Sequence, residues 1–164
     1  MSLHDDLLAD AWAMVNRKKA AGSTFRRAIS TAYYALFHHL IHEAVSLMIP
    51  NDWLRPVAAR AFDHSEMKRA SVSFTGRLPA NLVAAMPDSM QPSPDLIFVA
   101  ESFGTLQSAR HRADYDVSLV FTRSEARNFV QRAADAFEAW QRIRGSALAN
   151  AYLVSLLLVK KWDR

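Results

Sequence analysis

Apolar residues recur at helical spacing along most of the chain, and no strand-like alternation of useful length interrupts them. The strongest pattern predicts a helix from Thr24 to Met48. At 100° per residue, one broad arc of that helix collects Ile29, Tyr33, Tyr34, Phe37, Leu40, Ile41, Ala44, Val45, Leu47 and Met48. A surface helix needs a narrower stripe. The pattern therefore predicts a helix that is central in a bundle or packed on two partners, one of them a second subunit.

The other expected helices are delimited by capping residues and helix breakers. A first helix is expected from Ser2 to Lys19, with Ser2 as its N-cap. Shorter helical pieces are expected over residues 51–74. Prolines then crowd residues 75–94, so we expect a long, irregular connection there. Connections of this length in a compact domain are often functional or mobile, and we interpret residues 75–94 in this way.

The C-terminal part of the sequence predicts three more helices. Asp95 is the expected cap of the first. Thr122 and Glu125 are spaced as a capping box that opens the second, which Gly145-Ser146 ends. A last helix is expected to run to about Trp162. These elements predict an all-α fold, an antiparallel up-and-down bundle of about five to six helices in a single domain spanning residues 1–164.

Composition narrows the classes of protein. The 164 residues are 51% hydrophobic and 22% charged, as in an ordinary globular domain. The sequence has no cysteine, which excludes disulfides, thiolate zinc sites and cysteine nucleophiles and suits a reducing compartment. Acidic residues stand where an export signal needs basic ones, and the apolar run 147–159 is too short to cross a bilayer. We therefore expect a cytoplasmic protein without a membrane segment.

The net charge of +4 favours anionic partners only mildly. Arg17, Lys18 and Lys19 are interpreted as the ordinary basic end of a helix.

Two separate segments carry a recognisable pattern. Residues 26–38 read Arg-Arg-Ala-Ile-Ser-Thr-Ala-Tyr-Tyr-Ala-Leu-Phe-His, and residues 110–116 read Arg-His-Arg-Ala-Asp-Tyr-Asp. Together they resemble the HEPN superfamily, most closely its small stand-alone bacterial branch, in which these motifs recur in this order. The resemblance extends to about Arg144, so the helix within residues 146–164 is interpreted as an addition.

The resemblance implies a helical bundle that commonly forms a homodimer. Members of the family often accompany a minimal nucleotidyltransferase in toxin–antitoxin pairs, and many are metal-independent ribonucleases. Those ribonucleases carry an arginine followed after four to six residues by a histidine. None of the six histidines here has such an arginine, and Asp114 stands where the nuclease histidine is expected. An ionised aspartate would repel a phosphodiester, so whether the chain is an enzyme stays open.

Arginines and tyrosines of the two motifs are the candidate RNA- or nucleotide-binding residues: Arg26, Tyr34, Arg110, Arg112 and Tyr115. Each has a structural alternative. Arg26 is interpreted first as the partner of Asp114 in a buried pair that joins two helices, and second as a phosphate ligand. Arg110 and Arg112 form either a C-terminal helix cap or a phosphate-binding rim shared across a dimer. One tyrosine of the pair Tyr33-Tyr34 is expected in the core.

His38 is interpreted first as a semi-buried histidine with satisfied hydrogen bonds, and second as a proton shuttle facing Arg110 or Arg112. His38 and His42 are spaced as an i, i+4 pair, but His39 and Glu43 are expected to point away from them. Two ligands are too few for zinc, so neither a metal nor another cofactor is expected.

Three functional hypotheses follow. The first is a HEPN-like module that associates with RNA or nucleotide, with a nucleotidyltransferase-type partner, or with both, in a toxin–antitoxin setting. The second is a metal-independent ribonuclease with an unconventional site built from His38, Arg110 and Arg112. The third is a structural dimerisation module without a nucleic-acid role.

Overall fold

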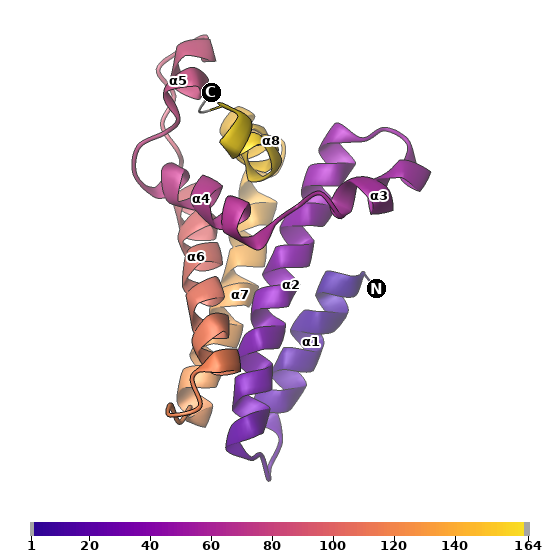
Figure 1. Cartoon of the computed structure of the whole chain (residues 1–164), viewed down its shortest axis with the longest axis vertical. Coiled ribbons are helices and arrows are strands. Elements are labelled where there is room, and N and C mark those ends of the chain that lie inside the picture. The colour runs from indigo at the N-terminus through magenta and orange to yellow at the C-terminus, as the bar shows by residue number, and fades with distance from the viewer. Residues whose placement is uncertain (1, 163–164) are drawn as a thin grey trace. The chain divides into compact units, whose positions relative to one another are not determined.

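A computed structural model describes residues 2–162, and every regular element in that range is helical. Figure 1 shows the elements in chain order. They are α1 (Leu3–Asn16), α2 (Gly22–Met48), the 3-10 helix η1 (Asp52–Leu54), α3 (Arg55–Ala59), α4 (His64–Thr75), α5 (Ala80–Ala85), α6 (Pro94–Tyr115), α7 (Arg123–Ile143) and α8 (Ala147–Trp162). The expected all-α class is confirmed.

The described range contains eight α-helices where about five to six were predicted. The excess comes from short elements. Helix α3 has five residues and α5 has six. Because α5 lies inside the proline-rich stretch, residues 75–94 are a pair of loops around one short helix and not the continuous irregular connection that was expected.

The described residues group into two compact units. Unit 1 comprises residues 2–39 and 102–138, and unit 2 comprises residues 40–101 and 139–162. The sequence predicted one domain over the whole chain. Helices α2, α6 and α7 contribute residues to both units.

Unit 1 is a bundle of four helical segments from α1, α2, α6 and α7, which run side by side in Figure 1. Short turns join α1 to α2 and α6 to α7, which makes each pair antiparallel. The core contains the fully buried Tyr33 of α2, whose ring centroid lies 5.6 Å from that of Phe103 of α6. Tyr33 is therefore the core tyrosine of the pair, and Tyr34 remains partly exposed.

Helix starts follow the capping signals of the sequence in two cases and depart from them in a third. Ser2 and Asp5 form a capping box at α1, and Thr122 and Glu125 form the predicted one at α7. Asp95, however, is not the cap of α6. The capping residue is Ser93, two residues earlier: α6 begins at Pro94, and the Ser93 hydroxyl accepts from the Leu96 amide at 3.2 Å.

Helix α2 is buried on more sides than its apolar arc indicates. His39 and Glu43, which were expected to point away from the packed face, are only 3% and 7% exposed. In unit 1 the His39 ring stacks on Phe137 at 4.2 Å. In unit 2 the Glu43 carboxylate accepts from Trp140 Nε1 at 2.9 Å and from Arg144 Nε at 2.7 Å. Helix α7 thus covers the polar side of α2 within each unit.

In unit 2, α4 packs against α8. The buried Tyr152 of α8 lies in edge contact with Phe74 and shares a 2.8 Å hydrogen bond with the Ser71 hydroxyl. Gly145 precedes α8 with φ +84°, a left-handed conformation that favours glycine and ends α7 as the sequence predicted. No helix among residues 2–162 has the length and apolar character needed to cross a bilayer.

Candidate functional site

The two sequence motifs meet inside unit 1 in a hydrogen-bonded network between α2 and α6. Arg110 Nη2 donates to the Tyr34 hydroxyl at 2.8 Å, and Arg110 Nε lies 2.9 Å from Asp114 Oδ2. The Ser30 hydroxyl donates to the other oxygen of Asp114. Ser30 and Tyr34 are four residues apart on α2, and Arg110 and Asp114 are four apart on α6, so each helix presents two polar groups on one face.

Arg110 is held on all sides by this network. Its guanidinium lies 5.9, 5.4 and 5.8 Å from the ring centroids of Tyr33, Tyr34 and Tyr115. Burial lowers the pKa of Arg110, but the Tyr34 hydrogen bond and the Asp114 charge outweigh it, so the net shift is upward. Arg110 is thus a fixed cation that orients tyrosines. It is not an open phosphate ligand.

Arg26 has a structural role other than the one predicted. Its guanidinium donates to the carbonyl oxygens of Ala113 at 2.7 Å, Asp116 at 2.8 Å and Leu119. The predicted pair between Arg26 and Asp114 is therefore wrong. The reason is that the end of α6 and the loop behind it leave carbonyl groups without helical partners, and Arg26 supplies the donors. Asp114 bonds to Ser30 and Arg110 instead.

His38 contacts the network at Tyr34. Its ring stacks on Tyr34 with centroids 6.3 Å apart and meets the edge of Phe37 at 5.2 Å. Tyr34 thus contacts both His38 and Arg110. Arg112 lies elsewhere, because its guanidinium sits 6.0 Å above the Phe121 ring. The three proposed catalytic residues do not form one cluster through the contacts described for them.

Tyr115 is an exposed member of the predicted set. It is the last residue of α6 and is 64% exposed. Its ring lies between two neighbours, because the Arg110 guanidinium is 5.8 Å from its centroid and the His111 ring is 4.9 Å away. Arg112 is also exposed in this turn. We call His111, Arg112 and Tyr115 the α6-end surface.

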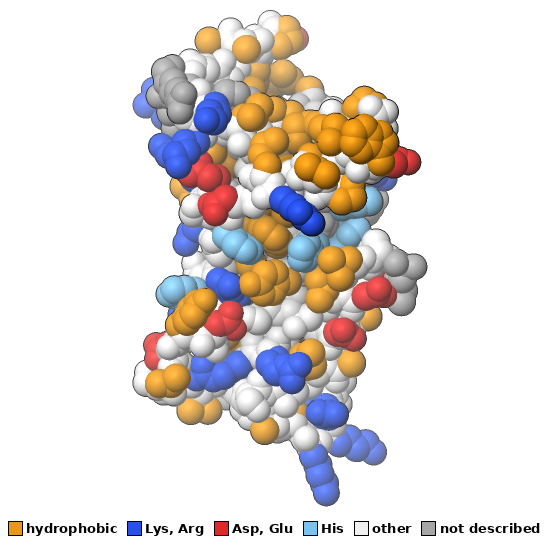
Figure 2. Space-filling view, turned by 45° about the vertical axis from the view of Figure 1, so that its right-hand side comes forward, with side chains coloured by type: hydrophobic (Ala, Val, Ile, Leu, Met, Phe, Trp, Pro, Cys, Tyr) orange, Lys and Arg blue, Asp and Glu red, His pale blue; other side chains and the backbone are white. Residues whose placement is uncertain are grey.

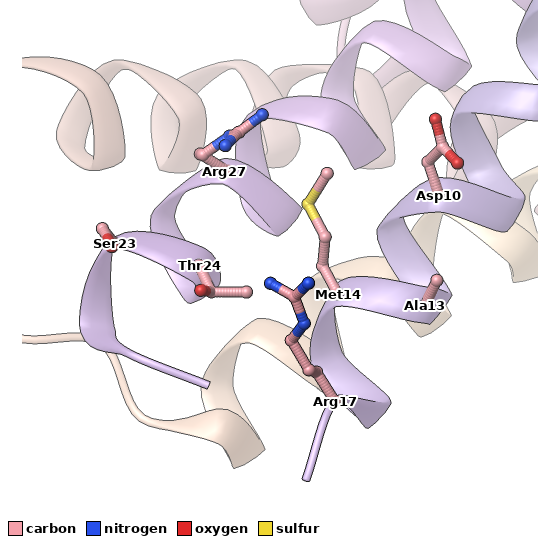
Figure 3. A pocket seen from close by; sticks show the side chains of 7 residues that line it. All are labelled: Asp10, Ala13, Met14, Arg17, Ser23, Thr24 and Arg27. Atoms are coloured by element: carbon pink, nitrogen blue, oxygen red, sulfur yellow. The ribbon is translucent and has the colours of Figure 1, made fainter. Parts of the chain in front are cut away.

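A second basic surface lies where α1 turns into α2. Figure 2 shows lysine and arginine side chains protruding at one end of the face in view, and the exposed basic residues of this turn are Arg17, Lys18, Lys19 and Arg27. A pocket of about 400 Å³ opens beside them. Its lining, drawn in Figure 3, consists of Asp10, Ala13, Met14, Arg17, Ser23, Thr24 and Arg27. Sequence reasoning missed this pocket.

The sequence contains the basic residues of the pocket but does not show that they lie close together. Arg17 is the C-cap of α1 and Arg27 lies on α2, ten positions later, so only the antiparallel turn places both at one pocket. The run Arg17-Lys18-Lys19 was interpreted as an ordinary helix end for lack of that information.

Among residues 2–162, no three histidine or acidic side chains lie close enough together to hold a metal ion. No family model, curated protein or solved structure matches the chain significantly. Function is therefore inferred from the geometry of the two surfaces.

Proposed function

We propose that the chain is a HEPN-like module that binds RNA or nucleotide through the α6-end surface of unit 1. The observation that supports this most is the state of Tyr115, which is 64% exposed although its ring is held by Arg110 and His111. An exposed aromatic ring with restricted motion is a stacking platform for a nucleobase, and each stacked base contributes about 1–3 kcal/mol.

Positive charge next to this platform supplies the phosphate contacts. Arg112 is exposed in the same turn as Tyr115. Arg26 donates to the carbonyl oxygen of Asp116, directly after Tyr115, and is followed on α2 by the exposed Arg27. The basic residues of the α1–α2 turn therefore belong to the same end of unit 1. In this proposal Arg26 and Arg110 position the surface, whereas Arg112 and Arg27 face the ligand.

Fluorescence anisotropy with a labelled single-stranded RNA tests the proposal. We expect binding that weakens steeply between 50 and 200 mM salt, as phosphate neutralisation requires. Tyr115→Ala should weaken binding about tenfold or more, whereas Tyr115→Phe keeps the ring and serves as the matched control. Equal affinities of the Ala and Phe variants, or binding that ignores salt, would reject the stacking surface.

The same RNA resolves the question of catalysis. We expect it to remain intact after incubation, because Arg110 is engaged by Asp114 and Tyr34 and because His38 packs on Tyr34. If the RNA is cleaved, and if cleavage disappears in His38→Ala but persists in Tyr115→Phe, the chain is a ribonuclease and not a binding module.

A protein partner is the second candidate function, and a specific observation favours it. Val117 and Val120 follow Tyr115 and are 91% and 84% exposed, which is unusual for apolar side chains so close together in sequence. A second copy of the chain or a nucleotidyltransferase-type protein would cover them. Light scattering on Val117→Ser with Val120→Ser tests the self-association: a dimer that becomes a monomer supports it, and a wild-type monomer excludes the second copy.

A further inference from the structure

Two arginines with exposed side chains line the pocket beside the α1–α2 turn. Arg17 and Arg27 both line it, and among the described residues neither guanidinium forms a hydrogen bond or an ion pair. Figure 3 shows the Arg17 guanidinium reaching between Met14 and Thr24 toward α2, while Asp10 lies away from it along α1. The pocket therefore presents two cations against one carboxylate, with that carboxylate at its far side.

Neighbouring arginines fix the backbone on which these two are carried. Arg123 donates to the carbonyl oxygens of Val15 and of Arg17, the latter at 2.8 Å, and its guanidinium lies over the Phe25 ring. Arg26 fixes the first turns of α2 through its bonds to Ala113, Asp116 and Leu119. Both sides of the pocket are thus held in place before any ligand arrives, which lowers the entropic cost of binding.

Two further lining residues carry hydroxyl groups, which suit an oxyanion. Ser23 and Thr24 add two hydroxyl donors beside the arginines. They lie in the first turn of the 27-residue helix α2, whose N-terminal end carries a partial positive charge. The volume of about 400 Å³ falls within the range of roughly 300–1,000 Å³ usual for small-molecule sites.

We infer that this pocket binds a terminal phosphate group, as carried by a nucleoside monophosphate or by the 5′ end of an RNA. The inference rests on the proposed function, because it names the part of the ligand that the basic turn receives. Arg17 and Arg27 would contact the phosphate oxygens, and Thr24 would donate its hydroxyl. A doubly charged terminal phosphate fits two guanidinium groups better than a singly charged internal phosphodiester does.

The first test uses inorganic phosphate and adenosine 5′-monophosphate with the full chain, followed by backbone amide NMR shifts. We expect saturable shifts of the residue 22–27 amides with both probes, and none with chloride at equal ionic strength. Arg17→Ala and Arg27→Ala should each weaken binding about tenfold, as loss of a charge-assisted contact does. Lys18→Ala and Lys19→Ala are the matched controls, since both lysines are exposed outside the lining.

The second test compares 5′-phosphorylated with 5′-hydroxyl RNA of one sequence. A preference for the phosphorylated RNA that vanishes in Arg27→Ala, while Tyr115→Ala weakens both RNAs, supports the pocket and the stacking surface together. RNA binding without that preference overturns the terminal-phosphate pocket and leaves the proposed function standing. Phosphate shifts without any RNA binding retain the pocket for mononucleotides and reject the RNA surface. Unchanged phosphate binding in the Arg17→Ala, Arg27→Ala double variant overturns the pocket altogether.

Discussion

Arg110 donates a 2.8 Å hydrogen bond to the hydroxyl of Tyr34, a residue 76 positions earlier in the chain. The bond joins α6 to α2 inside unit 1 and brings together the two segments that resemble the HEPN pattern. It also places the cation against three tyrosine rings. Contacts of Arg110 therefore link α2 to the last turns of α6 inside unit 1.

Removal of the Tyr34 hydroxyl should destabilise the fold measurably. In Tyr34→Phe the ring contacts remain, but Arg110 loses a hydrogen bond in a partly buried place. We expect a loss of about 1–2 kcal/mol in the free energy of unfolding, measured by urea denaturation. Tyr115→Phe removes a hydroxyl from an exposed tyrosine and should change that free energy by less than about 0.5 kcal/mol. Equal losses in the two variants would contradict the role of the bond.

Substitutions of the adjacent residues Arg26 and Arg27 are expected to have different effects on the free energy of unfolding. Arg26→Ala leaves three carbonyl groups near the end of α6 without their donor, so we expect a loss of about 2–3 kcal/mol in unfolding free energy. Arg27→Ala removes an exposed side chain and should cost less than about 0.5 kcal/mol. Denaturation of both variants under one condition checks this. A stable Arg26→Ala would show that water replaces the guanidinium.

The Asp114 carboxylate should contribute less than a buried ion pair does. Its side chain is 31% exposed, and that of Arg110 is 18% exposed, so solvent screens part of their attraction. We expect Asp114→Asn to lower the free energy of unfolding by about 1 kcal/mol. A double-mutant cycle with Arg110→Met isolates the coupling of the two groups. A loss above about 3 kcal/mol would instead indicate a fully desolvated pair.

Acid should weaken the helix starts. The backbone amide and the hydroxyl of Thr122 lower the pKa of Glu125, the Ser65 hydroxyl and the Glu66 amide lower that of Asp63, and the Ser2 hydroxyl lowers that of Asp5. A carboxyl whose folded pKa is depressed stabilises the protein above its unfolded pKa of about 4. That stabilisation disappears as the pH falls through the folded pKa.

The melting temperature should therefore be nearly level from pH 5 to 7 and fall below about pH 4. Glu125→Gln keeps the capping geometry but cannot titrate, so its melting temperature should fall less steeply in acid than that of the wild type. Glu138→Gln, in an exposed glutamate outside any cap, is the matched control. Parallel acid curves for Glu125→Gln and the wild type would show that this cap does not respond to pH.

The helical class, the central helix, the N-cap at Ser2 and the capping box at Thr122 could be predicted because they depend on local spacing. The cap at Ser2 and the box at Thr122 need only four consecutive residues. The short helix α5 could not be predicted, since prolines on both sides mask a six-residue pattern. The start of α6 was misplaced by two residues, because Asp95 is as good a cap as Ser93 in the sequence alone.

The sequence led us to expect that the two motifs meet, but it did not predict how their charged groups pair. Arg26, Arg110 and Asp114 do lie at one end of unit 1. However, Arg26 donates to main-chain carbonyl groups, and Asp114 pairs with Arg110. Composition cannot distinguish a main-chain acceptor from a carboxylate, because every residue carries a carbonyl group. His39 and Glu43 were misjudged for a related reason: a helical wheel of α2 does not show that α7 covers its polar side.

The donors that Arg26 brings to Ala113, Asp116 and Leu119 come from a residue 87 to 93 positions earlier in the chain. During synthesis that side chain therefore leaves the ribosome long before its acceptors do. The last turn of α6 is closed by a segment that is distant in the sequence, so a fragment that starts after α2 is expected to fray at Tyr115. Any truncation intended to isolate the α6–α7 hairpin would lose the ordered loop along with the arginine.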